Sequence, residues 1–239
     1  MLTELDLESI LFLDIETVPR EFHFDQLEGD WQELWSEKMR FLSEREGLSP
    51  EELYERAGIY AEFGKIICIS TAIFHQVKGE LCLRVKSFYG KDEKALLTEF
   101  LDMLTRFDRG NQRLLCGHNS KEFDIPYIAR RAVVCGLQLP SIINLTGKKP
   151  WEVQHLDTMQ MWKFGDYKHF TSLKLLAKLF DIPTPKEDIA GSDVARVFWE
   201  QDDLERIKAY CERDTVTVAR LVQRFQNLEP IHNDYIEVV

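Results

Sequence analysis

Short apolar runs alternate with longer segments of helical spacing along most of this chain. Four runs, ILFLDIE, KIICISTAIF, LCLRVKSFY and RLLCGHN, have the length and the β-branched content of buried strands. The tetrapeptide QVKG between the second and third runs predicts a hairpin, and EVQHL is a candidate for one more short strand. Strands are therefore expected at 10–16, 65–74, 81–89 and 113–119, with the candidate at 152–156.

Helical segments separate and follow these strands. DEKALLTEFLDMLTRF has helical spacing and an acidic first turn. In FDIPYIARRAVVCG, Pro126 suits the first turn of a helix and Gly136 suits its end. Residues 20–63 are expected to be an insertion between the first two strands, helical from about residue 31. Helices are expected at 92–107, 123–136, 171–180, 192–200 and 203–226.

The order of these elements indicates an α/β fold. Three early strands, then alternating helix and strand, then helices predict a central mixed β-sheet flanked by helices. A length of 239 residues fits one large domain, so residues 1–239 are expected to form a single domain.

Composition narrows the class of protein. The sequence is 44% hydrophobic, yet no apolar run reaches the length of a membrane span. The acidic start MLTELDLESI is unlike a signal or transit peptide, which leads us to expect a cytoplasmic protein without membrane association. The five cysteines are widely spaced, without C-x-x-C, and are interpreted as buried small hydrophobic residues.

The net charge is −11, from 41 acidic and 30 basic residues. Such a balance argues against broad coating of a duplex, which needs many Lys and Arg contacts to phosphate. It does not argue against an enzyme that holds a few nucleotides at one end. Such an enzyme needs only a local basic rim, and bound cations would cancel part of an acidic centre.

Asp14 and Glu16 lie two residues apart in LDIET, at the end of the first apolar run. The strand period of two places both carboxylates on one face. Apolar residues before the pair, and Val18 after it, suggest that these acids are not simply solvated. An edge-strand pair facing water is the alternative, and this segment alone does not decide between them.

Asn119 and Asp124 belong to HNSKEFD, which connects the strand ending near Gly117 to the helix beginning near Phe123. Sites in α/β folds tend to lie at such strand ends. Asp124 also suits the N-terminus of a helix, where a carboxylate interacts favourably with the helix dipole. The two roles are compatible.

Tyr210 and Asp214 are four residues apart in AYCERDTVTVARL, hence on one side of a helix. The intervening Cys211, Glu212 and Arg213 are expected to point elsewhere. Alone, the pair is an ordinary Tyr–Asp contact. Its weight comes from the order of three motifs: acid-x-acid on a strand, Asn-x-x-x-Phe-Asp at a strand–helix turn, and Tyr-x-x-x-Asp on a late helix.

This order resembles the DEDD superfamily of 3′–5′ exonucleases. One subgroup has His five residues before the last Asp, where this chain has Ala209; the other has Tyr four residues before it, as Tyr210 is here. The chain therefore resembles the tyrosine subgroup. Three flanking stretches are similar to stand-alone bacterial exonucleases related to the proofreading domain of family-B DNA polymerases: GHNSKEFDIPYIARRA, SLKLLAKLFDIPTPKEDIAGSDV and DLERIKAYCERDTVTVARL. At 239 residues, a polymerase domain beside the exonuclease domain is not expected.

The resemblance implies a ribonuclease H-like fold and two divalent cations, Mg²⁺ or Mn²⁺, which prefer carboxylate oxygens. It implies that Asp14 bridges both cations, that Glu16 and Asp214 complete the site that activates water, and that Asp124 holds the second cation. Tyr210, with a reference pKa near ~10, is expected to orient that water rather than deprotonate it.

Further residues are weaker candidates. Thr17, Asn119 and the backbone of Ile15 are expected to contact the 3′-terminal nucleotide. Phe123 either stacks on that nucleotide or packs in the core. Lys121 either contacts phosphate or is solvated.

Three other features are interpreted as structural. Asp157 is expected to cap a helix that begins at TMQMW. His118 does not match the position of the catalytic histidine in the other subgroup. The acidic run 51–56 is expected to be a solvated helix face.

The expected activity is metal-dependent hydrolysis of phosphodiester bonds from the 3′ end of single-stranded DNA, with release of nucleoside monophosphates. A 3′–5′ exoribonuclease and a non-catalytic nucleic-acid-binding module remain alternatives, because the motifs do not report on the sugar. The expected partner is a nucleic acid 3′ end, DNA before RNA, with room for a polymerase or repair protein as a further partner.

Overall fold

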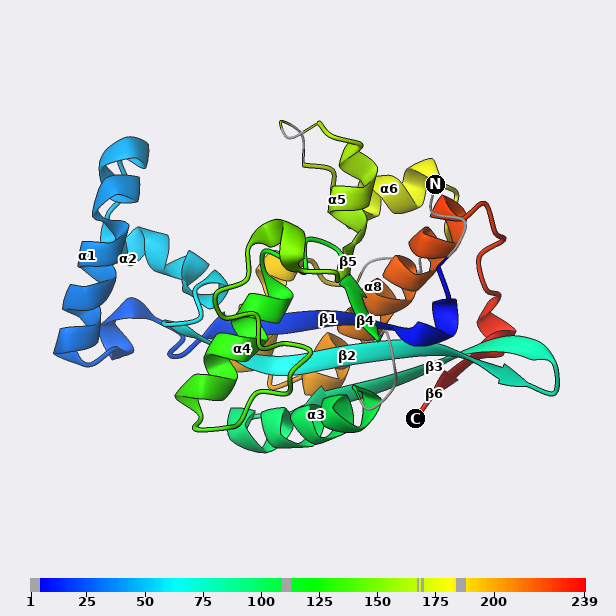
Figure 1. The fold of residues 1–239 in the computed structure, drawn as a ribbon. Coiled ribbons are helices and arrows are strands. Elements are labelled where there is room, and N and C mark those ends of the chain that lie inside the picture. The colour runs from blue at the N-terminus through cyan, green and yellow to red at the C-terminus, as the bar shows by residue number, and fades with distance from the viewer. Residues whose placement is uncertain (1–4, 109–112, 167, 169, 184–187) are drawn as a thin grey trace.

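The computed structural model describes residues 5–108, 113–166, 168, 170–183 and 188–239. A mixed six-stranded sheet with the order β5-β4-β1-β2-β3-β6 forms its centre (Figure 1). β1 pairs antiparallel with β2 and parallel with the short β4. The strands are β1 (Ile10–Pro19), β2 (Gly64–Val77), β3 (Glu80–Tyr89), β4 (Leu114–Gly117), β5 (Leu156–Asp157) and β6 (Ile236–Val238).

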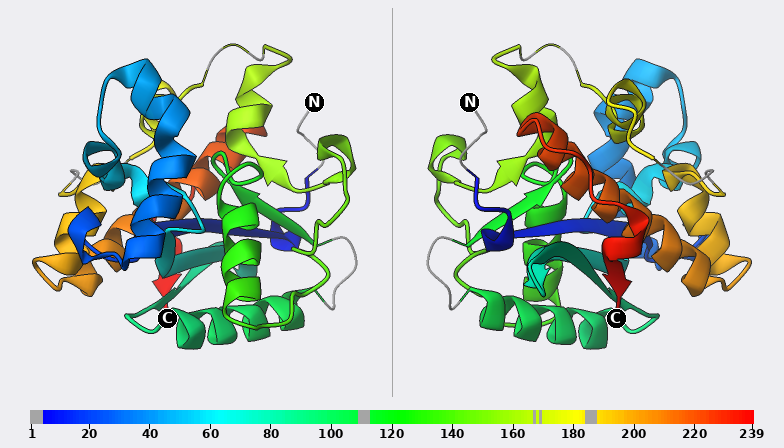
Figure 2. Two further views of the ribbon diagram at one scale, coloured as in Figure 1. Left: turned by 90° about the vertical axis from the view of Figure 1, so that its left-hand side faces the viewer. Right: turned by 90° about the vertical axis from the view of Figure 1, so that its right-hand side faces the viewer.

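Helices cover both faces of this sheet, with α3 and α4 on one side and α8 on the other (Figure 2). The α-helices are α1 (Gly29–Glu46), α2 (Pro50–Leu53), α3 (Glu93–Phe107), α4 (Asp124–Val134), α5 (Thr158–Lys163), α6 (Leu173–Leu179), α7 (Val194–Trp199) and α8 (Leu204–Phe225). The 3₁₀ turns are η1 (Leu7–Ser9), η2 (Phe24–Gln26), η3 (Tyr54–Ile59), η4 (Pro150–Glu152), η5 (Gly191–Asp193) and η6 (Asn233–Tyr235). The predicted mixed sheet flanked by helices is confirmed.

Local sequence signals account for several element ends. Lys78 and Gly79 both have positive φ, at 53° and 88°, which matches the two-residue hairpin turn predicted between β2 and β3. Gly136 has a φ of 71° just past α4, where a left-handed residue ends a helix with little strain. The candidate strand at 152–156 is smaller than expected, because only Leu156 and Asp157 pair with β4.

β1 divides the core, since its alternate residues face opposite helices. Leu11, Leu13 and Ile15 pack in one cluster with α3 and α4. Ile10 and Phe12 belong to a second cluster with α8. Continuing the second set by steps of two leads to Asp14 and Glu16, so both acids lie on the side of the sheet that α8 covers.

Residues 20–63 form a helical lobe with a core of its own. Trp35 is fully buried there and donates from Nε1 to the Pro50 carbonyl at 2.7 Å. The phenol of Tyr127, on α4, ties the lobe to the sheet by donating to the Gly58 carbonyl at 2.8 Å. The segment contains the helices α1 and α2, and its acidic run exposes Glu51, Glu52 and Glu55 as expected, while Leu53 and Tyr54 between them are buried.

β6 was not predicted from the sequence. It lies parallel to β3 at the sheet edge, with Leu83 opposite Ile236. A run of three residues carries no periodic signal, and only its neighbour defines it as a strand. Four of the five cysteines are buried as expected, whereas Cys135 is only partly buried.

Candidate active site

Asp14 and Glu16 lie beneath α8, in the middle of β1. Glu16 is 8% exposed, and Asp14 is partly buried. A β-bulge follows at once, because the pairing with β2 shifts between Glu16 and Thr17. Bulges are frequent beside functional sites, where they re-aim side chains. The interpretation of the pair as a solvated edge is wrong, since β1 lies inside the sheet between β4 and β2.

Asp124 reaches this pair from the opposite layer of helices. β4 pairs with β1 only from Ile10 to Phe12, so among the described residues no strand pairs with that edge of β1 beyond Phe12. Asp124, the first residue of α4, uses this gap: its Oδ1 accepts a hydrogen bond from the Ile15 N–H at 3.2 Å. The end of a short strand therefore lets a carboxylate from the α4 side of the sheet approach the acids on the α8 side.

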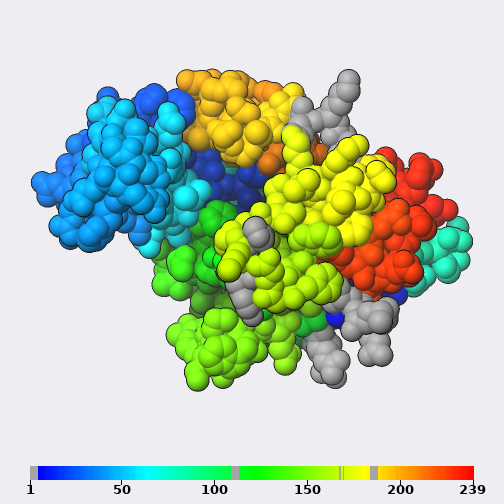
Figure 3. All heavy atoms as spheres, turned by 90° about the horizontal axis from the view of Figure 1, so that it is seen from above, coloured from blue at the N-terminus to red at the C-terminus, as the bar shows by residue number. Residues whose placement is uncertain are grey.

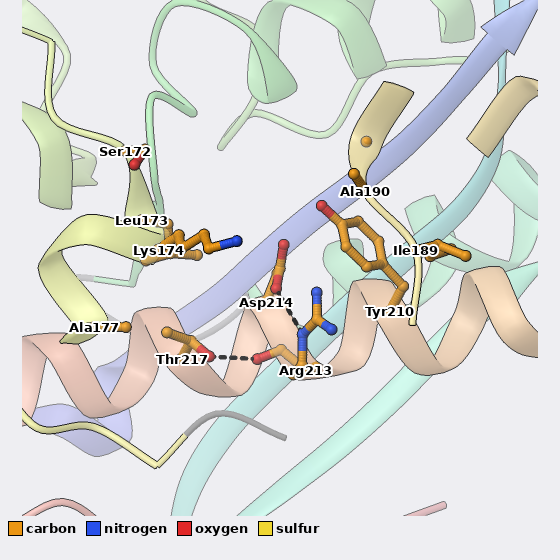
Figure 4. A pocket seen from close by; sticks show the side chains of 11 residues that line it. Ser172, Leu173, Lys174, Ala177, Ile189, Ala190, Tyr210, Arg213, Asp214 and Thr217 are labelled. Carbon is orange, nitrogen blue, oxygen red and sulfur yellow. Dashed lines mark hydrogen bonds and ion pairs between the residues drawn. The ribbon is translucent and has the colours of Figure 1, made fainter. Parts of the chain in front are cut away.

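Tyr210 and Asp214 approach from α8, at the border of the stripe that packs on the sheet. That stripe includes Cys211, Thr215 and Val218. The guanidinium of Arg213 lies 4.6 Å from the centre of the Tyr210 ring, and its Nε is 3.2 Å from Asp214 Oδ1. Arg213 thus fixes the orientation of both side chains, as Figure 4 shows.

Two of the residues between Tyr210 and Asp214 do not point away, which corrects the sequence-based expectation. The Cys211 thiol is 3.5 Å from Asp14 Oδ2 and 3.3 Å from the Asp14 carbonyl. Arg213 lines the same pocket as Tyr210 and Asp214. Only Glu212 turns elsewhere, accepting from the Ser87 hydroxyl at 2.8 Å. On α8, the side chains that face the sheet include Cys211 and, four residues later, Thr215. Tyr210 and Asp214 form the neighbouring row, which is displaced from the first by one residue.

The carboxylates perturb one another strongly. Burial raises the pKa of Asp14 well above its usual value, and the negative charges of Asp124 and Asp214 raise it further. Burial raises the pKa of Glu16 in the same way, followed by the charge of Asp14. Burial also raises the pKa of Asp124 to about 7, despite the hydrogen bond from Ile15. A cluster of buried acids with raised pKa values is typical of functional sites.

The cluster suits a hard divalent cation. Ligand atoms of Asp14, Glu16 and Cys211 all lie within 4.8 Å of one another. Carboxylate oxygens are the ligands that Mg²⁺ and Mn²⁺ prefer. Burial raises the pKa of the Cys211 thiol well above its usual value, so this sulfur stays protonated and donates to Asp14 instead of binding such a cation. Positive charge at this position would relieve the repulsion among the acids.

The turn that delivers Asp124 is shaped by Asp157. Its two carboxylate oxygens accept from the Asn119 and Lys121 N–H groups, each at 3.0 Å. Asp157 also accepts from Met159 and Gln160, which confirms the predicted cap of α5. The sequence indicated the cap alone. Asn119 has a φ of 66°, a left-handed conformation that Asn tolerates better than most residues.

His118 has the structural role that was predicted. Its Nδ1 lies 2.9 Å from the Thr158 hydroxyl, and its Nε2 lies 2.9 Å from the Thr171 carbonyl. Burial lowers its pKa, which favours the neutral ring. The histidine thereby joins the HNSKEFD turn to α5 and to the segment before α6.

The residues expected to contact the nucleotide lie around the acids, and several of them already have other partners within the protein. The Ile15 N–H already donates to Asp124. Lys121 donates from Nζ to the Val153 carbonyl at 3.0 Å, which directs it toward that loop. Phe123 is partly buried against the core, with its ring 5.4 Å from that of Tyr127. Thr17 and Asn119 are half-buried near the end of β1 and after β4.

A pocket of about 310 Å³ opens beside Tyr210 and Asp214. Lys174, at the start of α6, extends across it toward Asp214, and Arg213 lies between Asp214 and Tyr210 (Figure 4). Figure 3 shows the wider setting: β1, in dark blue, lies at the floor of a hollow between the helical lobe on one side and yellow atoms of the α6 region on the other. The sequence did not single out Lys174 or Arg213, because lone cations on helices carry no motif.

Comparison with known proteins agrees with this arrangement. A family described as a predicted 3′–5′ exonuclease related to the exonuclease domain of PolB matches residues 59–233. The chain belongs to this family. The match includes Asp124, Tyr210 and Asp214, whereas β1 with Asp14 and Glu16 precedes it.

Two archaeal relatives of the chain are DNA polymerases. The chain is 25% identical over 195 residues to the DNA polymerase of Pyrococcus glycovorans, covering 75% of this chain and 24% of that protein. It is 22% identical over 150 residues to the DNA polymerase of Desulfurococcus sp. (strain Tok), covering 57% of this chain and 19% of that protein. The chain thus spans about a quarter or less of the length of these relatives.

Within the described residues, no helix combines the length and the apolar character that crossing a bilayer requires.

Proposed function

We propose that this protein is a 3′–5′ exonuclease of the DEDD superfamily, in its tyrosine subgroup, with a ribonuclease H-like fold formed by residues 1–239 as a single domain. It removes nucleoside monophosphates from the 3′ end of single-stranded DNA. The observation that carries this proposal is the convergence of four carboxylates around β1, three of them with raised pKa values. The family match independently supports the 3′–5′ exonuclease class.

Asp14, Glu16, Asp124 and Asp214 would hold two divalent cations, Mg²⁺ or Mn²⁺. When bound, the cations would supply positive charge to the phosphodiester and a water poised for in-line attack. The protein's own contribution is a rigid set of oxygens on β1, α4 and α8. Without cations, holding these carboxylates together costs folding free energy, because burial and the neighbouring acids disfavour their charged forms.

Tyr210 is assigned to hold the attacking water by a hydrogen bond. Burial raises the pKa of its phenol well above the usual range, followed by the charges of Asp214, Glu16 and Asp14. The phenol therefore keeps its proton at neutral pH and acts as a donor. Arg213, packed on the ring, keeps the hydroxyl directed toward the pocket.

The 3′-terminal nucleotide is assigned to the hollow above β1. Thr17, Asn119 and the backbone at Ile15 are proposed to contact its sugar, and Phe123 to support its base. Lys121 is the weakest member of this set, since contact with phosphate requires it to leave the Val153 carbonyl.

The test uses one DNA oligonucleotide labelled at its 5′ end in one sample and at its 3′ end in another, with Mn²⁺ added to dialysed protein. A 3′–5′ exonuclease releases the 3′ label at once as a mononucleotide and shortens the 5′-labelled strand stepwise. Asp14→Ala should abolish both signals, whereas Glu51→Ala, which removes an exposed acid from the helical lobe, should not. Internal cleavage, or full activity of Asp14→Ala, would contradict the proposal.

A matched RNA oligonucleotide in the same assay separates the two substrate classes. Faster shortening of RNA than of DNA would replace the deoxyribonuclease with an exoribonuclease. If the protein binds 3′ ends but releases no nucleotide with either Mg²⁺ or Mn²⁺, it is a non-catalytic nucleic-acid-binding module instead.

A further inference from the structure

The two sides of the hollow above β1 differ in charge. The helical lobe, residues 20–63, contains twelve acidic and five basic residues. On the opposite side, the described residues between 158 and 179 include four lysines and one aspartate. In a chain with a net charge of −11, this second segment is a local concentration of positive charge. A phosphate backbone is attracted to one side and repelled by the other.

Aromatic rings accompany these lysines. Phe164 is 83% exposed and Phe170 is 69% exposed, and the Lys163 ammonium lies 4.3 Å from the centre of the Phe170 ring. Phe164 has a φ of 43°, a left-handed conformation that is strained for a bulky residue. The fold therefore keeps a large ring in water at an energetic cost, and core packing does not explain it.

The basic side also continues into the pocket at the acids. Lys174 lines that pocket together with Tyr210 and Asp214. Lys178 lies one turn further along α6, exposed and on the same side of the helix as Lys174. A strand that follows these two lysines would arrive at the carboxylates.

We propose that Lys163, Phe164, Phe170, Lys174 and Lys178 form a binding surface, the α5–α6 surface, for single-stranded nucleic acid. It holds the nucleotides on the 5′ side of the scissile bond. Exposed rings stack on bases whatever their sequence, and lysines neutralise the adjacent phosphates. A duplex would not fit this chemistry, because its bases are already stacked on each other. The inference rests on the proposed exonuclease activity.

The experiment compares a long and a minimal substrate in the presence of Mn²⁺: a 20-nucleotide single strand and the p-nitrophenyl ester of thymidine 5′-monophosphate. The double variant Phe164→Ala/Phe170→Ala should raise KM for the oligonucleotide at least about thirtyfold, the low end of the range for loss of two base-stacking contacts. Turnover of the ester should be unchanged, because it does not reach beyond the acids.

Phe41→Ala is the matched control. Phe41 is 72% exposed on α1, with Arg40 5.0 Å from its ring centre, but it belongs to the acidic lobe. Neither substrate should respond to it. Lys178→Ala should reduce the slope of log affinity against log salt for the oligonucleotide by about 0.7, the contribution of one phosphate contact on a single strand.

An unchanged oligonucleotide KM in the double variant would overturn the proposal. An equal loss on both substrates would overturn it too, since the rings would then support the acids and not a strand. Should the native protein cleave neither substrate, the exonuclease assignment fails separately. Fluorescence anisotropy of the same oligonucleotide without metal then decides: weaker binding by the double variant than by Phe41→Ala supports the α5–α6 surface, and equal binding contradicts it.

Discussion

Leu13 and Asp14 are neighbours on β1 but face opposite sides of the sheet. Leu13 is 1% exposed in an apolar cluster with α3 and α4. Asp14 faces α8, where a thiol and other carboxylates replace apolar side chains. The first side of the sheet contributes burial of apolar surface, which stabilises the fold. The α8 side buries less apolar surface at this point of β1 and brings acidic side chains together instead.

Apolar packing and the candidate chemistry therefore lie on opposite sides of one strand. The α3/α4 side holds β1 rigid, so the acids on the other side keep their relative positions despite their repulsion. An enzyme that must hold charged groups close together before its substrate arrives needs such a support.

Asp14→Asn should reduce exonuclease activity by about 10²–10³-fold or more, the scale of losing one essential electrostatic group. Its melting temperature without metal should not fall, because the amide cannot take on the negative charge that burial and the neighbouring acids disfavour. Leu13→Ala should do the reverse: a loss of about 2–5 kcal/mol in unfolding free energy, with specific activity of the folded protein retained. Denaturant unfolding measures the unfolding free energy of the two variants, and the labelled-oligonucleotide assay measures their activity. The contrast fails if Asp14→Asn is the less stable of the two variants.

Tyr210→Phe should slow cleavage roughly ten- to a hundredfold, because a mispositioned water is expected to cost about that much. It should not alter metal binding, since the phenol is not a carboxylate ligand. Single-turnover rates and a Mn²⁺ titration followed by melting temperature separate the two effects. Loss of the Mn²⁺ response in this variant would assign the phenol to the metal site instead.

Mn²⁺ should raise the melting temperature of the native protein by about 5–10 °C at a concentration one hundred times its Kd, through preferential binding to the folded state. The gain should shrink in Asp14→Asn and persist in Leu13→Ala. Calorimetry with and without EDTA checks this. An equal gain in both variants would place the bound ion somewhere other than the α8 side of β1.

Without metal, stability should fall modestly as the pH rises. The pKa of Asp124 is raised to about 7, whereas an unfolded Asp has a pKa near ~3.9. The folded state therefore holds the extra proton between these values, and its stabilising contribution is lost as pH rises through about 7. Asp124→Asn should flatten this dependence in melting curves at pH 5 and pH 8. A slope that is identical in the variant would mean that other groups cause it.

Several features were predictable because local rules govern them. The turn at Lys78–Gly79, the end of α4 at Gly136 and the cap at Asp157 each follow from the conformational preference or hydrogen-bonding capacity of single residues. The positions of Asp14 and Glu16 on one face follow from the strand period. The helical lobe could be recognised as an insertion, but its separate core around Trp35 could not, since that core joins residues from several turns and helices.

The order of the residues alone specifies where the acids occur along the chain and on which periodic face of each element they lie. Only the tertiary structure sets how those faces meet. In the folded protein, β4 ends at Gly117, and Asp124 reaches the backbone of β1 beyond the short β4 pairing. α8 packs on the sheet with the side that carries Cys211, whose thiol contacts Asp14. The tertiary structure also placed the helical lobe, which is rich in acidic residues, and the lysine-bearing α6 region on two sides of the hollow. Periodicity is a property of one segment, whereas the rotation of a helix about its axis and the length of a neighbouring strand are set by packing between segments.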